Sequence, residues 1–321
     1  MKIRKVRIHR FGGSDVLQVD EVEPSMPGAL QVLVSVKAAS INPVDFKTRN
    51  GQYPPVKQDR LPYTLGRDVS GIVERCGAQA QQFQVGDEVL GVISVAGGGF
   101  AEKAVLDQQA LARKPTMLDY TQAAAIPVAG TTAWQGLFRH GQLKEGQSVL
   151  IHGGSGGIGH FAIQFAKARG ARVLATVSSG NVGFARSLGA DVVIDYKTER
   201  FEDQARDLDL VFDLVDGETR ERSWMLLKPG GILVSPLTEP SQEKAGQHGV
   251  RALRYVMEAN GRDLAEIVEL VKSGKVKPHV QKQFRLEQAA EALSVVEQGK
   301  SVGKIVLTLD ADYETAKSAL L

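Results

Sequence analysis

The sequence predicts an α/β protein in which a doubly wound parallel sheet is inserted into a second, strand-rich region, and three observations lead to this fold class. Apolar strand candidates alternate with amphipathic helical stretches between residues 148 and 257, a pattern typical of a parallel sheet with right-handed crossovers. Up to about residue 111, short alternating runs are broken by Gly, Pro, Asn and Asp, which predicts an all-β region. After Pro278 the chain returns to a strand, a helix and a final strand.

Six strands are predicted for the inserted sheet, and this number matches a doubly wound dinucleotide-binding fold. They lie at residues 148–152, 172–177, 191–194, 209–214, 231–235 and 250–256. The sixth would stand at the sheet edge and could pair with a copy of itself, so we expect a homodimer. Outside this sheet, strands are predicted at 31–38, 69–76, 87–92 and 304–309, and helices at 120–125, 132–139, 160–169 and 286–298.

Composition limits the classes of partner. Lys and Arg number 39 against 37 Asp and Glu, without blocks of one sign, so neither nucleic acid nor an anionic membrane is an expected partner. The single cysteine, Cys76, excludes a disulfide framework and suits a reducing compartment. No apolar run approaches the roughly 18 residues of a membrane span, and Met1–Ile8 alternates like a strand and not like a signal peptide. We expect a cytoplasmic protein that binds a small molecule.

The strongest motif is glycine-rich: Gly154-x-Gly156-x-x-Gly159 follows the first predicted strand of the sheet and opens a predicted helix. The first glycine is expected to allow a tight turn, the second to let the backbone approach a pyrophosphate, and the third to permit close helix–strand packing. The helix N-terminus would present free N–H groups to the anion. The residues expected to contact the phosphates are Gly154, Ser155, Gly156, Gly157, Ile158 and Gly159. A glycine-rich turn without a ligand is the alternative.

The identity of the nicotinamide cofactor depends on the residue about 20 positions beyond this loop, because a carboxylate there accepts from a ribose 2′-hydroxyl and repels a 2′-phosphate. Residues 171–190 contain no Asp or Glu. The second strand leads instead into Ser178, Ser179 and Asn181, whose hydroxyl and amide groups can donate to a phosphate. This favours NADPH over NADH. Ser178 and Ser179 can also act as an N-cap for the next helix, and the two roles are compatible.

Further motifs lie in order along nearly the whole chain. They are Asn42-Pro43-Val44-Asp45, Arg49-x-Gly51-x-Tyr53-Pro54, Leu65-Gly66-Arg67-Asp68-Val69-Ser70-Gly71, Gly86-Asp87-Glu88-Val89, Gly130-Thr131-Thr132-Ala133-Trp134, Leu188-Gly189-Ala190-Asp191-x-x-Ile194-Asp195-Tyr196 and Gly303-Lys304-Ile305-Val306-Leu307. With the glycine loop they resemble the zinc-free quinone oxidoreductase (zeta-crystallin-like) branch of the medium-chain dehydrogenase/reductase superfamily, which includes enone reductases. The resemblance implies a GroES-like substrate domain at residues 1–125 and 263–321, interrupted by a Rossmann domain at 126–262, with the active site in the cleft between them.

The resemblance assigns catalytic roles to two polar residues of the first domain. Asn42 and Tyr53 match positions that face the nicotinamide pocket in the family, where an amide and a phenol hydrogen-bond a substrate carbonyl and the phenol donates a proton. The structural alternatives are that Asn42 only shapes the Asn-Pro turn and that Tyr53 packs on Pro54.

Other positions are implied to contact the cofactor. Thr131 and Thr132 open a helix that points at it, or simply cap that helix. Tyr196 matches a tyrosine beside the 2′-phosphate, although a lysine that some relatives carry near this site is missing here. Val215 lines the nicotinamide site through its backbone, or is a core valine. Lys304 reaches the cofactor, or caps the final strand.

The zinc enzymes of the superfamily hold a catalytic metal with a cysteine, a histidine and a further cysteine or carboxylate. In this chain Asn42, Arg67 and roughly Val128 stand at those positions, so the resemblance implies no metal. Arg67 and Asp68 are expected to form an ion pair in the vacated space.

A missing Lewis acid makes alcohol oxidation unexpected. Hydride addition to a quinone or an α,β-unsaturated carbonyl needs less electrophilic help, because conjugation delocalises the negative charge. The sequence therefore predicts an NADPH-dependent quinone or enone reductase. An NADPH-binding structural or interaction protein with little activity is the alternative, and a zinc alcohol dehydrogenase is a remote third hypothesis.

Overall fold

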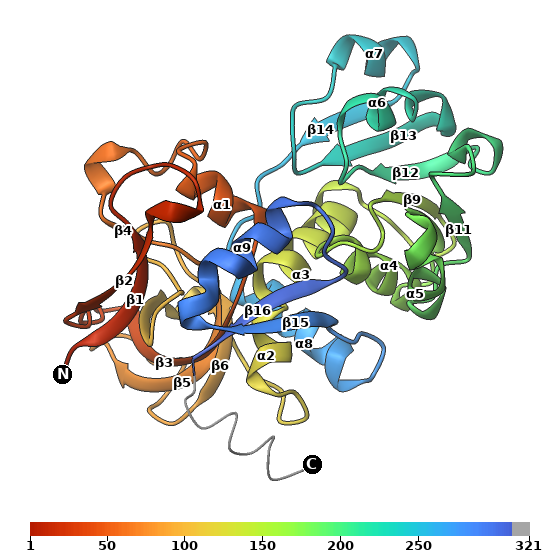
Figure 1. Cartoon of the computed structure of the whole chain (residues 1–321). Coiled ribbons are helices and arrows are strands. Elements are labelled where there is room, and N and C mark those ends of the chain that lie inside the picture. The colour runs from red at the N-terminus through yellow and green to blue at the C-terminus, as the bar shows by residue number, and fades with distance from the viewer. Residues whose placement is uncertain (310–321) are drawn as a thin grey trace, which may run out of the picture. The chain divides into compact units, whose positions relative to one another are not determined.

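The computed structural model describes residues 1–309 and divides into two compact units (Figure 1). Unit 1 comprises Met1–Val128, Ala259–Val268 and the chain from Pro278 onwards, whereas unit 2 comprises Ala129–Glu258 and Glu269–Lys277. The first boundary thus lies slightly beyond the expected residue 125, and a short stretch near residue 270 joins unit 2. Residues 310–321, which the expected C-terminal domain included, lie outside the described residues.

Unit 2 is built on a six-stranded parallel sheet with the order β11-β10-β9-β12-β13-β14. Its strands are β9 (Ser148–His152), β10 (Arg172–Val177), β11 (Val192–Asp195), β12 (Leu208–Phe212), β13 (Leu227–Ser235) and β14 (Arg251–Arg254). Counted along the chain, this order is 3-2-1-4-5-6, which confirms the predicted doubly wound fold. Strand β14 lies at the sheet edge, as predicted, and β13 begins earlier than the predicted residue 231.

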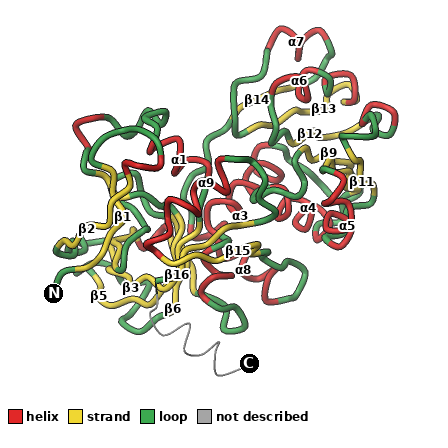
Figure 2. Tube along the Cα trace, viewed as in Figure 1, coloured by secondary structure: helices red, strands yellow, loops and turns green. Residues whose placement is uncertain are grey.

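The central strands of the unit 2 sheet, β9, β10 and β12, are largely apolar and buried, which is typical of parallel strands covered on both faces. Val149, Leu150 and Ile151 of β9 are fully buried. Helix α4 (Gly159–Ala168) adds Phe161 and Phe165, and burial of each ring contributes about 1.5–3 kcal/mol. Helix α4 contacts β9 and β10, and shorter helices lie near other strands of the sheet (Figure 2). These shorter helices are α5 (Val182–Ser187), α6 (Gly217–Glu221) and α7 (Gln242–Gln247).

Unit 1 contains a seven-stranded and a three-stranded sheet. The larger has the order β15-β16-β3-β5-β6-β8, with β7 also paired to β3, and the smaller has the order β2-β1-β4. The strands are β1 (Ile3–Ile8), β2 (Leu17–Val22), β3 (Gln31–Ser40), β4 (Tyr63–Thr64), β5 (Asp68–Cys76), β6 (Glu88–Val92), β7 (Lys103–Asp107), β8 (Leu111–Arg113), β15 (Val280–Arg285) and β16 (Lys304–Thr308). Val306 of β16 lies opposite Ser40 of β3 in an antiparallel pair, so distant parts of the chain share one sheet.

Helix α3 (Pro127–Trp134) corrects a predicted boundary. It begins at Pro127, whose fixed φ suits the first helical turn, so Thr131 and Thr132 lie inside the helix and neither open nor cap it. The helix continues as a π-helix over Gln135–His140. The other helices are α1 (Pro43–Arg49), α2 (Tyr120–Ala124), α8 (Gly261–Lys272) and α9 (Ala289–Glu297). Among residues 1–309, none of the helices has the length and apolar character needed to cross a membrane.

Candidate functional site

The glycine loop connects β9 to α4 and closes tightly on itself. Gly153 has a φ of 75°, so the left-handed turn lies one residue before the predicted Gly154. Gly154 does not form this turn but lies close to β10. A Cβ on Gly154 would lie only 3.0 Å from the Cβ of Ala175. A Cβ on Gly159 would lie 2.2 Å from the carbonyl oxygen of Gly153, which is the close approach predicted for the third glycine. At Gly156 a Cβ would come no closer than 3.4 Å to that oxygen, so the backbone stays open to a phosphate.

His152, the last residue of β9, fixes the start of this loop through a chain of hydrogen bonds. Ser223 Oγ donates its one proton to Thr219 O at 2.7 Å, so this hydroxyl can only accept from His152. His152 Nε2 is therefore the donor in their hydrogen bond of 2.9 Å. The other ring nitrogen, Nδ1, then accepts from Thr176 Oγ1 at 3.0 Å, and Thr176 Oγ1 accepts from Gly153 N at 3.4 Å. Complete burial lowers the pKa of His152 to about 3, which keeps the imidazole neutral.

The predicted phosphate donors after β10 do lie together. Asn181 Nδ2 donates to Ser155 Oγ and to Ser178 Oγ, both at 3.1 Å, which joins the glycine loop to this turn. The side chain of Ser178 makes no capping hydrogen bond, so the N-cap alternative is wrong for that residue. A hydrogen bond from the Ser179 side chain lowers the pKa of Asp195, at the end of β11. Sequence reasoning missed Asp195 as a neighbour of Ser179 because it considered the second strand alone.

Three other residues expected at the cofactor have contrasting surroundings. Tyr196 is 57% exposed, and Val215 is 49% exposed, so Val215 is not the core valine of the alternative interpretation. Thr131 is fully buried, and its Oγ1 has no hydrogen-bond partner among residues 1–309.

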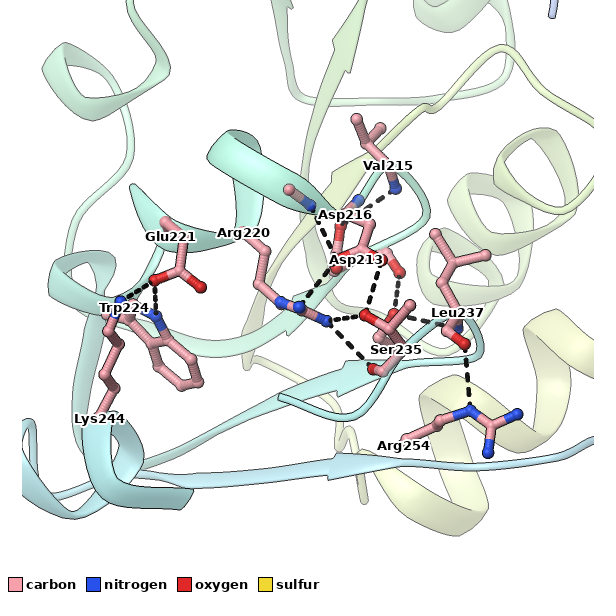
Figure 3. A network of polar contacts seen from close by, with 12 residues as sticks. Asp213, Val215, Asp216, Arg220, Glu221, Trp224, Ser235, Leu237, Lys244 and Arg254 are labelled. Atoms are coloured by element: carbon pink, nitrogen blue, oxygen red, sulfur yellow. Dashed lines mark hydrogen bonds and ion pairs between the residues drawn. The ribbon is translucent and has the colours of Figure 1, made fainter. Parts of the chain in front are cut away.

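A polar network that includes the backbone of Val215 connects the turn after β12 to the turn after β13 (Figure 3). Buried Asp213 accepts from the backbone N–H groups of Val215 and Asp216 at 3.1 and 2.9 Å, and burial raises its pKa. Asp216 has a φ of 72°, pairs with Arg220 at 2.8 Å and accepts from Thr238 Oγ1 at 2.6 Å. The Asp216-Gly217 pair is a turn signal that could have revealed this network in the sequence.

In unit 1, a buried lysine holds the side chain of Asn42. Lys304 Nζ donates to Asn42 Oδ1 at 2.6 Å and to Ile41 O at 2.9 Å, and lies 3.5 Å from Asp68 Oδ2. Burial lowers the pKa of Lys304, and its three N–H groups are directed at these oxygens. Lys304 therefore neither caps the final strand nor keeps a donor for the cofactor contact we predicted.

The carboxylate of Asp68 accepts hydrogen bonds from the other polar groups of this cluster. It accepts from Ser40 Oγ at 2.5 Å, from Asn42 Nδ2 at 2.8 Å and from Val128 N at 2.6 Å. Both ends of the Asn42 amide are thus engaged, which leaves one N–H, directed at Ser40 O at 3.5 Å. Lys304 and Asp68 thus hold the Asn42 side chain in place. Its amide has little hydrogen-bonding capacity left for a substrate.

The residues at this cluster do not fit a catalytic zinc. Asn42 and Val128 offer no zinc ligand, Arg67 is a cation, and the ammonium of Lys304 adds a second positive charge. In the part of the chain that the structure describes, no group of three or more His, Cys, Asp or Glu side chains is placed to hold a metal ion.

Asp45 lies beside the cluster and was not singled out from the sequence as a buried group. Burial raises its pKa to about 7, while its carboxylate accepts from Asn42 N at 2.7 Å and Gly66 N at 3.1 Å. Asn42 and Asp45 form the capping box at the start of α1. The Asn-x-x-Asp spacing was the available signal.

The expected ion pair between Arg67 and Asp68 is wrong. Successive side chains of an extended segment point in opposite directions, so the carboxylate faces Lys304 while the guanidinium faces away. Arg67 Nε donates to Ile93 O at 2.6 Å, and Nη1 donates to Tyr53 Oη at 3.4 Å. Tyr53 and Arg67 therefore lie together in unit 1, both partly buried.

Comparisons with known proteins agree with this architecture. The alcohol dehydrogenase GroES-like domain matches residues 28–116, and the zinc-binding dehydrogenase family matches residues 188–307. The chain is 35% identical to 2-methylene-furan-3-one reductase of Solanum lycopersicum, over 92% of this chain and 76% of the relative.

Solved structures show the same likeness. The quinone oxidoreductase of Coxiella burnetii superposes with a TM-score of 0.89 at 33% identity, covering 97% of this chain and 100% of that one. The Escherichia coli quinone oxidoreductase in complex with NADPH has a TM-score of 0.86 at 28% identity, covering 95% and 100%. The chain therefore belongs to the medium-chain dehydrogenase/reductase superfamily, with quinone and enone oxidoreductases among its relatives.

Proposed function

We propose that this protein is an NADPH-dependent reductase that transfers a hydride to a quinone or to an α,β-unsaturated carbonyl compound. The observation that carries the proposal is the glycine loop, whose open backbone at Gly156 adjoins the hydroxyl and amide cluster of Ser155, Ser178 and Asn181. The hydroxyls of Ser155 and Ser178 accept from Asn181 and keep their own protons, so these neutral groups suit a 2′-phosphate. The related E. coli structure was solved with NADPH, which supports the same cofactor here.

The proposed cofactor contacts follow from the loop and its surroundings. The loop residues 154–159 would bind the pyrophosphate, and Ser178, Ser179, Asn181 and Tyr196 would surround the 2′-phosphate. Thr131 Oγ1 and the backbone at Val215 would meet the remainder of the dinucleotide, because the first lacks a partner among the described residues and the second is exposed. When bound, NADPH supplies the hydride.

The chemistry on the acceptor is assigned to organic groups without a metal, because the residues at Asp68 do not fit zinc. Tyr53 Oη accepts a hydrogen bond from Arg67, and its own proton has no acceptor among residues 1–309. That proton is available to the carbonyl oxygen of an acceptor. Asn42, held by Lys304 and Asp68, shapes the neighbouring backbone and is assigned a positioning role.

The test is a panel of quinones and enones assayed with NADPH and NADH side by side. We expect acceptor-dependent NADPH oxidation, with a preference of at least about tenfold in kcat/KM over NADH, equivalent to about 1.4 kcal/mol. Tyr53→Phe should lower kcat while leaving the Kd for NADPH unchanged. If NADPH binds and no acceptor is reduced, the catalytic proposal fails and a structural or interaction role replaces it.

Two further expectations accompany the proposal. The backbone edge of β14 is free within the sheet and supports the prediction of a homodimer, which sedimentation analysis would test. A cytoplasmic location remains a prediction from the sequence.

A further inference from the structure

Arg67 is a partly buried cation without a carboxylate partner. Its hydrogen bonds go to Ile93 O and Tyr53 Oη, and it forms no ion pair among residues 1–309. Asp68, its chain neighbour, is occupied by Lys304 and other donors. Arginine has five N–H donors, so donors of Arg67 remain beside the Tyr53 hydroxyl.

Charge balance around Arg67 favours an incoming anion. The charge of Arg67 lowers the pKa of Asp45, but the Asp45 carboxylate makes no ion pair with Arg67 and already accepts hydrogen bonds from two backbone N–H groups. A partly desolvated guanidinium is normally paired with a carboxylate or phosphate. Within residues 1–309, a guanidinium without an ion-pair partner and a phenolic proton without an acceptor thus lie side by side at Arg67 and Tyr53.

We propose that Arg67 and Tyr53 form an oxyanion site, in which the acceptor oxygen rests against the guanidinium as it becomes negative. This inference rests on the proposed function and names the substrate class further: acceptors whose oxygen passes through an enolate or phenolate. Such a site supplies the charge stabilisation that a metal supplies in zinc enzymes. Arg67 thereby acts as a catalytic residue that occupies a zinc-ligand position of the fold.

The proposed step balances in electrons and protons. The hydride brings two electrons to the acceptor carbon, the conjugated π electrons move to the acceptor oxygen, and the cofactor is oxidised by the same two electrons. For an enone, Tyr53 passes its proton to the oxygen and solvent restores the phenol. Arg67 changes neither its protonation nor its covalent structure, because guanidinium groups remain charged in proteins.

A binding experiment tests the site without turnover. The probe is 4-nitrophenolate, a stable aromatic oxyanion, compared by calorimetry with the neutral analogue 4-nitroaniline, using the full chain with NADP⁺ present. We expect the wild-type protein to bind the phenolate at least about tenfold more tightly, equivalent to about 1.4 kcal/mol. Arg67→Gln should remove this difference and Arg67→Lys should keep part of it. Equal affinity for the two probes in the wild type, or no measurable binding of the phenolate, overturns the proposal.

Arg60 provides a matched control. Its Nη1 donates to Val95 O at 2.9 Å, which resembles the bond from Arg67 to Ile93 O, but the residue is exposed. Arg60→Gln should leave both probe affinities unchanged. Equal losses of phenolate affinity in both variants would show only a general effect of surface charge and would overturn the assignment.

Kinetics separate this inference from the proposed function. Arg67→Gln should lower kcat with an enone by roughly 100-fold, the cost of one oxyanion donor, while the Kd for NADPH and the thermal midpoint stay near wild type. If the wild type reduces enones and Arg67→Gln does so equally well, the oxyanion site is refuted and the reductase stands. If the wild type reduces none, the reductase proposal itself fails.

Discussion

Acidification from about pH 7 to about pH 5 is expected to weaken unit 2 through His152. The pKa of this histidine is about 3 in the folded chain and 6.5 ordinarily. Between these values the unfolded chain binds a proton that the folded chain excludes, so the free energy of unfolding falls as the pH falls. At about 1.36 kcal/mol per pH unit below the ordinary pKa, the loss between about pH 7 and about pH 5 is about 2 kcal/mol.

Tryptophan fluorescence during urea unfolding measures this effect selectively. The chain has two tryptophans, Trp134 and Trp224, and both belong to unit 2, as does His152. The variant His152→Asn keeps one donor and one acceptor but does not titrate. The variant should be less stable than the wild type at about pH 7. Between about pH 7 and about pH 5, its free energy of unfolding should fall by about 2 kcal/mol less than that of the wild type. An unchanged pH dependence in the variant would refute the reasoning.

Three other substitutions are expected to act at separate places. Gly159→Ala should abolish NADPH binding measured by calorimetry, because a Cβ would lie 2.2 Å from a loop carbonyl oxygen, whereas Gly183→Ala has open space and should bind normally; retained binding in the first would contradict the loop assignment. Lys304→Met should destabilise unit 1 by about 3–5 kcal/mol in calorimetric unfolding, because Asp68 loses its buried cation, and adding Asp68→Asn should recover part of the loss; no recovery would argue against the pairing. Ser178→Asp should reverse the NADPH preference in steady-state kinetics, and an unaltered preference would remove this turn from the 2′-phosphate site.

Local patterns made the fold and the glycine loop predictable. The strands 148–152 and 172–177 were predicted at their observed bounds, because apolar runs flanked by turn residues define both ends. The loop was equally local, since its glycines, the strand before it and the helix after it lie within a short stretch. Only the position of the tight turn moved, from Gly154 to Gly153.

The polar cluster of unit 1 could not be predicted in the same way. Lys304 and Asn42 are joined only because β16 pairs with β3, a register that local periodicity does not encode. The ion pair of Arg67 with Asp68 was wrong because adjacency in sequence was taken for adjacency in space. The alternation of an extended segment would have argued against it.

The pairing of β16 with β3 also determines the order in which the protein can be completed during synthesis. Strand β3 leaves the ribosome early, but its antiparallel neighbour β16 and the counter-charge for Asp68 are made only after all of unit 2 has emerged. Unit 2 has a sheet formed within one continuous stretch and can fold while unit 1 still lacks β15 and β16. In an incomplete chain, Asp68 would therefore still lack the cation that lies beside it in the finished protein, while the sheet of unit 2 could already be formed.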